Sequence, residues 1–387
     1  MSSQLIYLDH AAATPVDERV AAAMQPYFSE LFFNPSSPYA PAVEVRRSYE
    51  AAKARLAATF GAKGDEIIIT AGATESINLA FWSATGHVVT SALEHPAVLE
   101  AARLKSHTIV PATSKGIITP EAIAGAITPE TGLVSVQLAN NEIGTIQPIR
   151  AIADVVEAER QRRRNESDKT PLYFHCDASQ GFGQIDVHTA RLAVDLLTLN
   201  SGKIYGPKQI GLLWAKPGVQ LSPLIVGGGQ ERGLRSGTEN VAGVVGFAMA
   251  AELADKHRRG ESERLAKLRD SLQETLLTEF PEAVVSGHPK KRLPGSLHIS
   301  FTGLDAERLV FALEARNVLV ATGSACAANK GTRSHVLTAI GLEPAVADGS
   351  LRLTLGRLSD EAAVKSAQSI LTEEIRHEYE RTSHAAR

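Results

Sequence analysis

The sequence predicts an α/β protein with a mainly parallel central sheet and a second, smaller domain towards the C-terminus. The first observation behind this prediction is an alternation of short apolar runs with helical segments over most of the 387 residues. The second is that polar residues directly follow several of these runs. The third is a change of pattern beyond residue 251, where a long charged helix precedes strands and helices in mixed order.

The individual elements follow from the hydrophobic spacing. Residues 44–60 carry many alanines and spaced charges, which predicts a helix. Residues 66–70 form a short β-branched run that predicts a buried strand, and 72–76 lead into a second helix over 77–83. Further short apolar runs predict strands at 88–91, 133–138, 172–176, 196–199 and 211–214. Because helical segments separate most of these runs, their strands are expected to pair mainly in parallel.

A domain boundary is expected near 251–262, where a charged helix over 252–276 begins. The pattern after this helix is mixed, which predicts a smaller α+β domain. Its strands are expected at 296–301 and 351–355, and its helices at 307–316, 334–340 and 360–379.

The composition is that of an ordinary globular protein, with 44% hydrophobic and 21% charged residues. A net charge of −3 gives no reason to expect nucleic acid or an anionic membrane as a main partner. Cys176 and Cys326 are too few for a disulfide framework or a metal knuckle, which favours a reducing compartment. Because neither a signal-peptide pattern nor a bilayer-spanning stretch is seen, we expect a cytoplasmic protein. No metal-binding residues are expected in the site.

Residues 157–169 are rich in charge, with a run of arginines between a predicted helix and the strand at 172–176. Such a segment is most often a solvated helix end and loop. Contact with RNA or with an acidic partner is the weaker alternative.

Asp177 and Lys203 form the most informative pair. Each follows an apolar run, in the strings Tyr173-Phe-His-Cys-Asp-Ala-Ser-Gln180 and Ser201-Gly-Lys-Ile-Tyr-Gly-Pro-Lys208. A pyridoxal phosphate enzyme needs a lysine to hold the cofactor as a Schiff base and a carboxylate to keep its pyridine nitrogen protonated. A P-loop is excluded, because position 197 is Leu where that motif requires Gly.

Other polar residues at strand ends are expected to reach the same crevice, which lies beyond the carboxyl ends of parallel strands. Ala73 and Thr74 open a helix whose backbone amides and hydroxyl suit a phosphate. His95 and Asn141 also follow apolar runs, and His95 is placed to stack on a pyridine ring. Taken alone, each of these residues would more often be structural.

Two candidates lie in the predicted small domain. Arg352 stands in a strand-like run, where it either faces water or clamps a carboxylate. Cys326 lies in the small-residue string Gly323-Ser-Ala-Cys-Ala-Ala-Asn-Lys-Gly331, which predicts an exposed and reactive thiol. Cys176 is interpreted as inert, because it ends an apolar strand.

Taken in order, these strings resemble the cysteine desulfurases of the class V aminotransferase family, over nearly the whole chain from Tyr7 to Gly356. The matching words, beyond those quoted above, are Tyr7-Leu-Asp-His-Ala-Ala-Ala-Thr-Pro15, Asn34-Pro-Ser-Ser37, Glu94-His95, Asn140-Asn-Glu-Ile-Gly144, Gly227-Gly-Gly-Gln-Glu-Arg-Gly233 and Arg235-Ser-Gly-Thr238. The resemblance implies the pyridoxal phosphate-dependent, aspartate aminotransferase-like fold. It also implies a large domain of residues 14–257 and a small domain of residues 1–13 and 258–387.

The resemblance implies roles for individual residues. Lys203 would hold pyridoxal 5'-phosphate, Asp177 would pair with the pyridine nitrogen, and Gln180 with the ring hydroxyl. His95 would stack on the ring and assist proton transfer. The remaining roles are phosphate binding by Ala73, Thr74 and Thr238 of the other subunit of a homodimer, and substrate binding by Asn141, Arg352 and Asn34. Cys326 would take the sulfur of L-cysteine as a persulfide, leaving L-alanine, and pass it to an acceptor protein for iron–sulfur clusters or for thiolation of tRNA or cofactors.

The sequence departs from the family pattern around the phosphate. The family usually has His immediately before the Schiff-base lysine, and here that residue is Gly202. Asn200 stands where a phosphate-binding Ser is usual, so Asn200 and Ser201 are the candidate phosphate ligands. Residues 38–43 also lack the usual His and Gly. The spacing from Cys326 to His335 resembles the long-loop subgroup that hands sulfur to a scaffold protein.

Two other functions fit the same fold. One is another class V reaction, either transamination or lyase chemistry on selenocysteine or cysteine sulfinate. Cys326 argues against transamination, which needs no thiol there. The other is a non-catalytic sulfur-carrier or interaction protein that has lost the cofactor, supported only by the changes at Gly202 and Asn200.

Overall fold

The structure, a computed structural model, describes residues 5–323 and 333–385. A seven-stranded sheet in the order β2-β8-β7-β6-β5-β3-β4 forms its centre. The strands are β2 (Ile67–Thr70), β3 (His87–Ser91), β4 (His107–Val110), β5 (Thr131–Ser135), β6 (Tyr173–Asp177), β7 (Leu196–Asn200) and β8 (Gly211–Ala215). Strand β8 runs antiparallel to β2 and β7, and all other neighbours pair in parallel. The predicted fold class, an α/β protein with a mainly parallel sheet, is confirmed.

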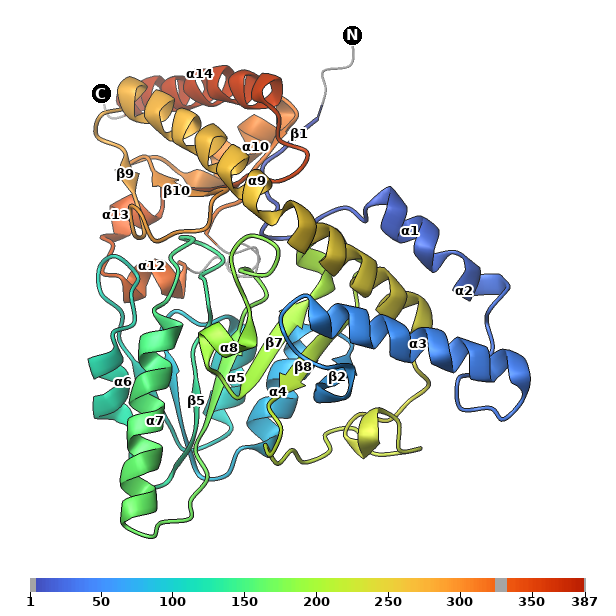
Figure 1. The fold of residues 1–387 in the computed structure, drawn as a ribbon. Coiled ribbons are helices and arrows are strands. Elements are labelled where there is room, and N and C mark those ends of the chain that lie inside the picture. Colours follow the sequence, from blue (N-terminus) through green and yellow to red (C-terminus); the bar gives the residue numbers. More distant parts are fainter. Residues whose placement is uncertain (1–4, 324–332, 386–387) are drawn as a thin grey trace.

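Side chains alternate between two apolar layers on either side of this sheet, as the pleat of a strand requires. Ile68 and Leu213 belong to one core cluster, whereas Ile67, Ile69 and Leu212 belong to the other. The helices that accompany the sheet are α3 (Ala40–Ala58), α4 (Ala73–Ser83), α5 (Pro96–Arg103), α6 (Pro120–Ala126), α7 (Ile149–Asn165) and α8 (Thr189–Leu192). Helices α1 (Glu18–Met24) and α2 (Pro26–Ser29) precede them, and α1 and α3 pack against α9 (Val241–Glu279) (Figure 1).

Helix α9 corrects the predicted start of the charged helix at 252. It is a single helix of 39 residues that extends from the large sheet to the smaller sheet in the C-terminal part of the chain (Figure 1). It begins at Val241, well before the predicted start at 252, with the Asn240 side chain accepting a hydrogen bond from Gly243 N at 2.9 Å. Its first turns are buried and apolar on all sides, so they lack the amphipathic periodicity by which a helix is found in a sequence.

The C-terminal part contains a three-stranded antiparallel sheet in the order β12-β10-β9. Its elements are β9 (Val284–Val285), β10 (Ser296–Ser300), α10 (Ala306–Ala315), β11 (Val318–Leu319), α12 (His335–Ala339), α13 (Pro344–Ala347), β12 (Ser350–Thr354) and α14 (Glu361–Ala385). Strand β1 (Ile6–Tyr7) pairs in parallel with β11, and Ile6 and Leu8 belong to the core cluster of this part. The shared core supports the assignment of residues 1–13 to a small domain, and the boundaries themselves stay a prediction.

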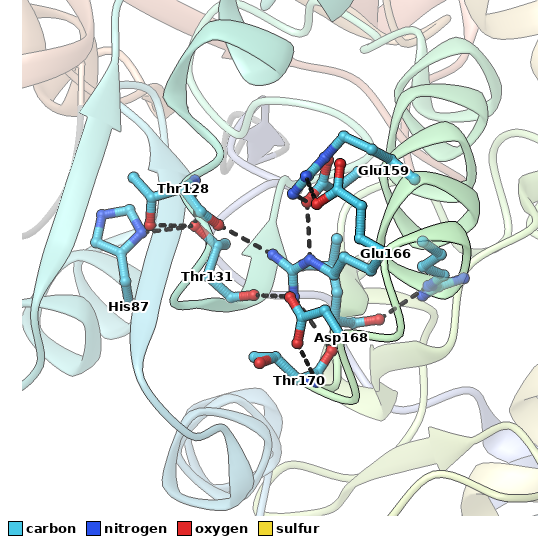
Figure 2. Close-up of polar contacts among 11 residues, drawn as sticks. His87, Thr128, Thr131, Glu159, Glu166, Asp168 and Thr170 are labelled. Carbon is cyan, nitrogen blue, oxygen red and sulfur yellow. Dashed lines mark hydrogen bonds and ion pairs between the residues drawn. The ribbon is translucent and has the colours of Figure 1, made fainter.

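The arginine-rich end of α7 is tied down by contacts within the chain (Figure 2). Arg163 is 2% exposed, and its guanidinium donates to the carbonyl oxygens of Thr128 (3.0 Å), Thr131 (2.9 Å) and Thr170 (3.2 Å) and to the Glu159 carboxylate (2.8 Å). The expectation of a solvated segment was therefore wrong for Arg163, because its charge is matched by the Glu159 carboxylate and by three carbonyl groups, one of them on Thr131 at the start of β5. Among the described residues, no helix is both long and apolar enough to cross a bilayer.

Candidate active site

A cavity of 280 Å³ lies at the carboxyl ends of the parallel strands, where the sequence placed the site. The strands β2, β3, β5, β6 and β7 all point their carboxyl ends to it, because β2 and β7 are both antiparallel to β8. The cavity is lined by the predicted residues Ala73, Thr74, His95, Asn141, Asp177, Gln180, Asn200, Lys203 and Arg352. These residues come from both sheets, so tertiary packing brings them together.

Lys203 ends the short turn Ser201–Lys203 that follows β7. Its ammonium donates to the carbonyl oxygens of Ala11 and Ala12, both at 2.7 Å. The Gln180 side chain donates to the same Ala11 oxygen at 3.1 Å. The segment after β1 therefore fixes the side chains of Lys203 and Gln180, two of the candidate cofactor ligands.

Asp177 is the last residue of β6 and is 9% exposed. Its Oδ1 accepts a hydrogen bond from Ser179 N at 3.0 Å, which fixes the carboxylate at the cavity wall. The preceding residue, Cys176, is fully buried, and burial raises the pKa of its thiol well above the usual value. Cys176 is therefore an unreactive core residue, consistent with its interpretation from the sequence.

His95 begins α5 as its N-cap, and its Nδ1 accepts a hydrogen bond from Ala97 N at 3.1 Å. An accepting Nδ1 is unprotonated, so the neutral ring carries its proton on Nε2. Burial lowers the pKa of His95, and the nearby Lys203 and His335 lower it further, whereas Asp177 opposes them. The ring is therefore neutral at neutral pH, as stacking on a pyridine and proton transfer require.

Glu94, next to His95, is fully buried behind the cavity. It accepts hydrogen bonds from Ser91 Oγ (2.6 Å) and from Gln137 N (3.0 Å). Burial, helped by the negative charge of Asp177, raises the pKa of Glu94 to about 8. Glu94 is thus protonated at neutral pH and adds no second negative charge beside Asp177.

Arg352 lies on β12 and is 3% exposed. Its Nη2 donates to Asp9 Oδ1 at 2.7 Å, and its Nη1 to the carbonyl oxygen of Asn141 at 3.4 Å. Its Nε is buried without a partner among the described residues. A buried guanidinium at a cavity wall suits the carboxylate of an amino acid.

A second cavity of 570 Å³ shares Ala73, Thr74, Asn200 and Lys203 with the first. Ala73 and Thr74 are the first residues of α4, whose amides have no partner within the helix. Gly72 precedes them with φ of 144°, a conformation that favours glycine. A Cβ on Gly211 of β8 would lie 2.8 Å from the Gly72 Cα, so glycine at 211 allows the strand to approach this turn. The result is an open cradle suited to an anion.

Four predicted residues lie elsewhere or are not described. The Ser201 Oγ is buried on the Gly206 side of the turn, without a partner in the described chain. The Asn34 side chain accepts from Ser36 N at 2.9 Å, and neither Asn34 nor the exposed Thr238 lines the cavities of the described subunit. Cys326 lies outside the described residues. The roles of these four residues stay predictions.

The sequence reasoning missed several polar groups that line the two cavities: Gln137, Glu142, Ser179, His335 and Lys208. It also missed Asp9 as the partner of Arg352. His335 donates from Nε2 to the carbonyl oxygen of Glu94 at 2.9 Å, and Ser334 donates to Glu142 at 2.5 Å. Glu142 and Lys208 each lie in a string used for the resemblance. The sequence therefore showed their positions in the chain but did not show that their side chains line the cavities.

The residues present fit a phosphorylated pyridine cofactor. An amine on Lys203, a carboxylate on Asp177 and a neutral imidazole on His95 line one cavity, and the anion cradle adjoins it. This donor set provides a carbonyl-reactive amine, a partner for a ring nitrogen and free amides for a phosphate.

Known proteins were compared with the chain. The class V aminotransferase family matches residues 6–366. Cysteine desulfurase IscS 1 of Archaeoglobus fulgidus is 39% identical over 94% of this chain and 95% of its own length. A solved NifS-like protein superposes with a TM-score of 0.88 at 31% identity, over 97% of this chain and all of its own. SspA, solved in complex with cysteine, gives 0.76 at 34% identity over 90% of this chain and 98% of its own.

These matches confirm the family that the motifs indicated, and with it dependence on pyridoxal phosphate. They extend over nearly all of this chain and of the relatives. The chain belongs to the class V aminotransferase family, among its cysteine desulfurases.

Proposed function

We propose that the protein converts L-cysteine to L-alanine with pyridoxal phosphate and takes the sulfur onto Cys326 as a persulfide. The observation that carries this proposal is the convergence of Lys203, Asp177 and Arg352 on one cavity. Lysine and aspartate suit the cofactor, and arginine suits the carboxylate of an amino acid. Substrate choice is supported by the structure of the similar protein SspA, which was solved with cysteine.

The chain's own residues would orient the substrate and move its protons. Arg352 and Asn141 would hold the carboxylate, which directs the α-carbon towards Lys203. Once its amine is released by the substrate, Lys203 would take the α-proton, and the neutral His95 would assist proton transfer. The bound cofactor supplies an electron sink for the negative charge that develops at the α-carbon, and Asp177 would maintain that sink by pairing with the ring nitrogen.

The Cys326 thiolate would attack the substrate sulfur. The S–S bond forms, the carbon–sulfur bond breaks, and its electron pair and a proton stay with the product as alanine. Ser334 and His335, which follow Cys326 in the sequence, support this role. His335 lines the cavity, and Ser334 donates to Glu142. Sulfur would therefore be received close to Lys203.

We also propose a homodimer that transfers sulfur to an acceptor protein, for iron–sulfur assembly or thiolation. The dimer is supported by large apolar side chains that are exposed in the single subunit, among them Phe28, Phe32, Tyr39 and Val226. Thr238, predicted to serve the neighbouring subunit, is exposed and outside this subunit's cavities. The identity of the acceptor and the cytoplasmic location stay predictions.

The test is alanine formation from L-cysteine by the purified protein with a reductant. Wild type and the Cys176→Ser control should form alanine, because Cys176 is buried away from the cavity. Lys203→Ala should lose both the cofactor's visible band and alanine. Cys326→Ser should keep the band and lose alanine.

Two outcomes would favour the alternatives. A normal band with alanine still formed by Cys326→Ser would contradict the persulfide step and point to another class V reaction. A protein that takes up no cofactor would point to the non-catalytic carrier.

A further inference from the structure

We infer that Lys208 supplies the positive charge that binds the cofactor phosphate, an inference that rests on the proposed pyridoxal phosphate function. Lys208 lines the anion cradle together with Gly72, Ala73 and Thr74 at the start of α4. The sequence left the phosphate ligands open, because Gly202 precedes Lys203 and Asn200 ends β7. The structure places a lysine beside both residues.

The Lys208 side chain extends across the face of Gly202. A Cβ built on Gly202 would lie 3.7 Å from Lys208 Cγ and 3.6 Å from Asn200 Oδ1. Both are ordinary contact distances. The absence of a side chain at Gly202 therefore leaves a space in the wall of the cradle, and the Lys208 side chain lies beside that space. The turn through Gly206-Pro207 brings Lys208 back to this wall, five residues beyond Lys203.

The charge of Lys208 is available for a ligand. Its Nζ donates to the carbonyl oxygen of Thr14 at 2.6 Å, and no ion pair joins it to a carboxylate in the part of the chain that the structure describes. An ammonium has three donors, so two stay available after the bond to Thr14. Glu75, the carboxylate of the same cradle, is paired with Arg235 at 2.9 Å and bound by Ala71 N at 2.8 Å.

The two candidates from the sequence bring no charge. Asn200 Oδ1 already accepts from Gly202 N at 3.0 Å, which leaves its amide NH₂ as a neutral donor. Ser201 Oγ is buried on the Gly206 side of the turn and lines neither cavity. The α4 amides and Thr74 hold a phosphate by hydrogen bonds, and Lys208 adds the opposite charge beside them.

The test compares pyridoxal 5'-phosphate with pyridoxal, which lacks the phosphate. Apo protein is titrated with each, and the dissociation constant is read from the visible band. Lys208→Gln keeps a donor for Thr14 and removes the charge. It should weaken pyridoxal phosphate binding by roughly ten- to a hundredfold, the range for a hydrogen bond to a charged group, and leave pyridoxal binding unchanged.

Two control variants complete the experiment. Lys208→Arg should bind pyridoxal phosphate nearly as wild type does, because it keeps the charge. Lys216→Gln removes an exposed lysine that lines neither cavity and should change nothing. If Lys208→Gln weakened the binding of both compounds equally, Lys208 would instead have the role of holding the Thr14 segment. Unchanged binding of both compounds would also overturn the inference. A wild-type protein that acquires no band refutes the proposed function itself, which is a different result from either.

Discussion

At the scale of single residues, the proposed substrate site includes the pair formed by Arg352 and Asp9. Asp9 lies in the segment after β1, and Arg352 lies 343 residues further on, with 2.7 Å between their charged atoms. Arg352 is almost fully buried, and a buried charge is costly unless it is matched. Asp9 therefore acts as a positioning residue that holds the guanidinium at the cavity wall.

Asp9→Asn should weaken cysteine binding because Arg352 loses the partner that orients it. We expect KM for cysteine to rise about tenfold, equivalent to about 1.4 kcal/mol, with a smaller change in kcat and an unchanged cofactor band. Asp17→Asn is the matched control, since Asp17 pairs with Arg19 and Arg357 and lines neither of the site cavities. A fall in kcat at constant KM would contradict this role.

Glu94 should make the stability of the fold depend on pH. Its folded pKa of about 8 lies above the ordinary value of 4.5, so the folded state holds a proton that the unfolded state releases between these values. Its contribution to the free energy of unfolding is complete below the ordinary pKa and is lost as pH rises towards 8.

Glu94→Gln, which mimics the protonated acid, should therefore gain stability relative to wild type as pH is raised from 5 to 8. Denaturant unfolding at several pH values measures this difference. A difference that does not change with pH would show that Glu94 is ionised in the fold.

At the scale of elements, Arg163 helps to fix α7 to the sheet, and it is the middle one of three consecutive arginines. Arg163 binds the carbonyl oxygens of Thr128 and Thr131 on the approach to β5, whereas Arg164 is more than half exposed and pairs with Glu157. Two neighbouring arginines therefore differ in burial, and the buried one, Arg163, contacts the sheet.

Arg163→Met should lower the free energy of unfolding by about 3 kcal/mol, because it leaves buried carbonyl groups unpaired. Arg164→Met should change it by less than about 0.5 kcal/mol, as surface substitutions do. The two variants are compared by denaturant unfolding of the same preparation. Equal effects would show that α7 is not held by the buried contacts.

Strand prediction also depended on burial. The strand predicted at 66–70 was found as β2, whose residues are all buried and β-branched. Strand β4 was missed because its His107 and Ile109 are exposed and its apolar pattern is weak, whereas β2, the other edge strand, is buried throughout. An edge strand is defined by its neighbour β3 more than by its own residues.

At the scale of the whole molecule, α9 joins the two core clusters. Its first turns, from Val241 to Ala254, pack in the core of the large sheet, and Leu265 to Leu276 pack in the core of the C-terminal part. Gly260 lies between these stretches, is exposed, and has no atom within 4 Å of the position a Cβ would take.

Gly260→Ala should raise the free energy of unfolding by about 1 kcal/mol, because alanine is the better helix former and no contact opposes it. Gly246→Ala in the same helix is the matched comparison. There the new Cβ would lie 2.6 Å from Met24 Sδ, so the gain should be lost or reversed. Thermal unfolding of both variants gives the comparison, and a destabilised Gly260→Ala would mean that the helix needs its glycine.

The sequence by itself determined the fold class, the family and the residue types of the site. Alternating apolar runs predicted the parallel sheet, and polar residues at the ends of those runs predicted where ligands bind. These features are local, since each depends on a few consecutive residues and on the period of a strand or helix.

Only the tertiary structure decided which partners those residues have. The pairing of Asp9 with Arg352, the buried charge of Arg163, the raised pKa of Glu94 and the approach of Lys208 to Gly202 all arise between segments or turns that pack in space. Burial and distance govern the strength of charges and hydrogen bonds, and neither is written in the local pattern. The packing of the two sheets therefore brings the residues of the site together around one cavity.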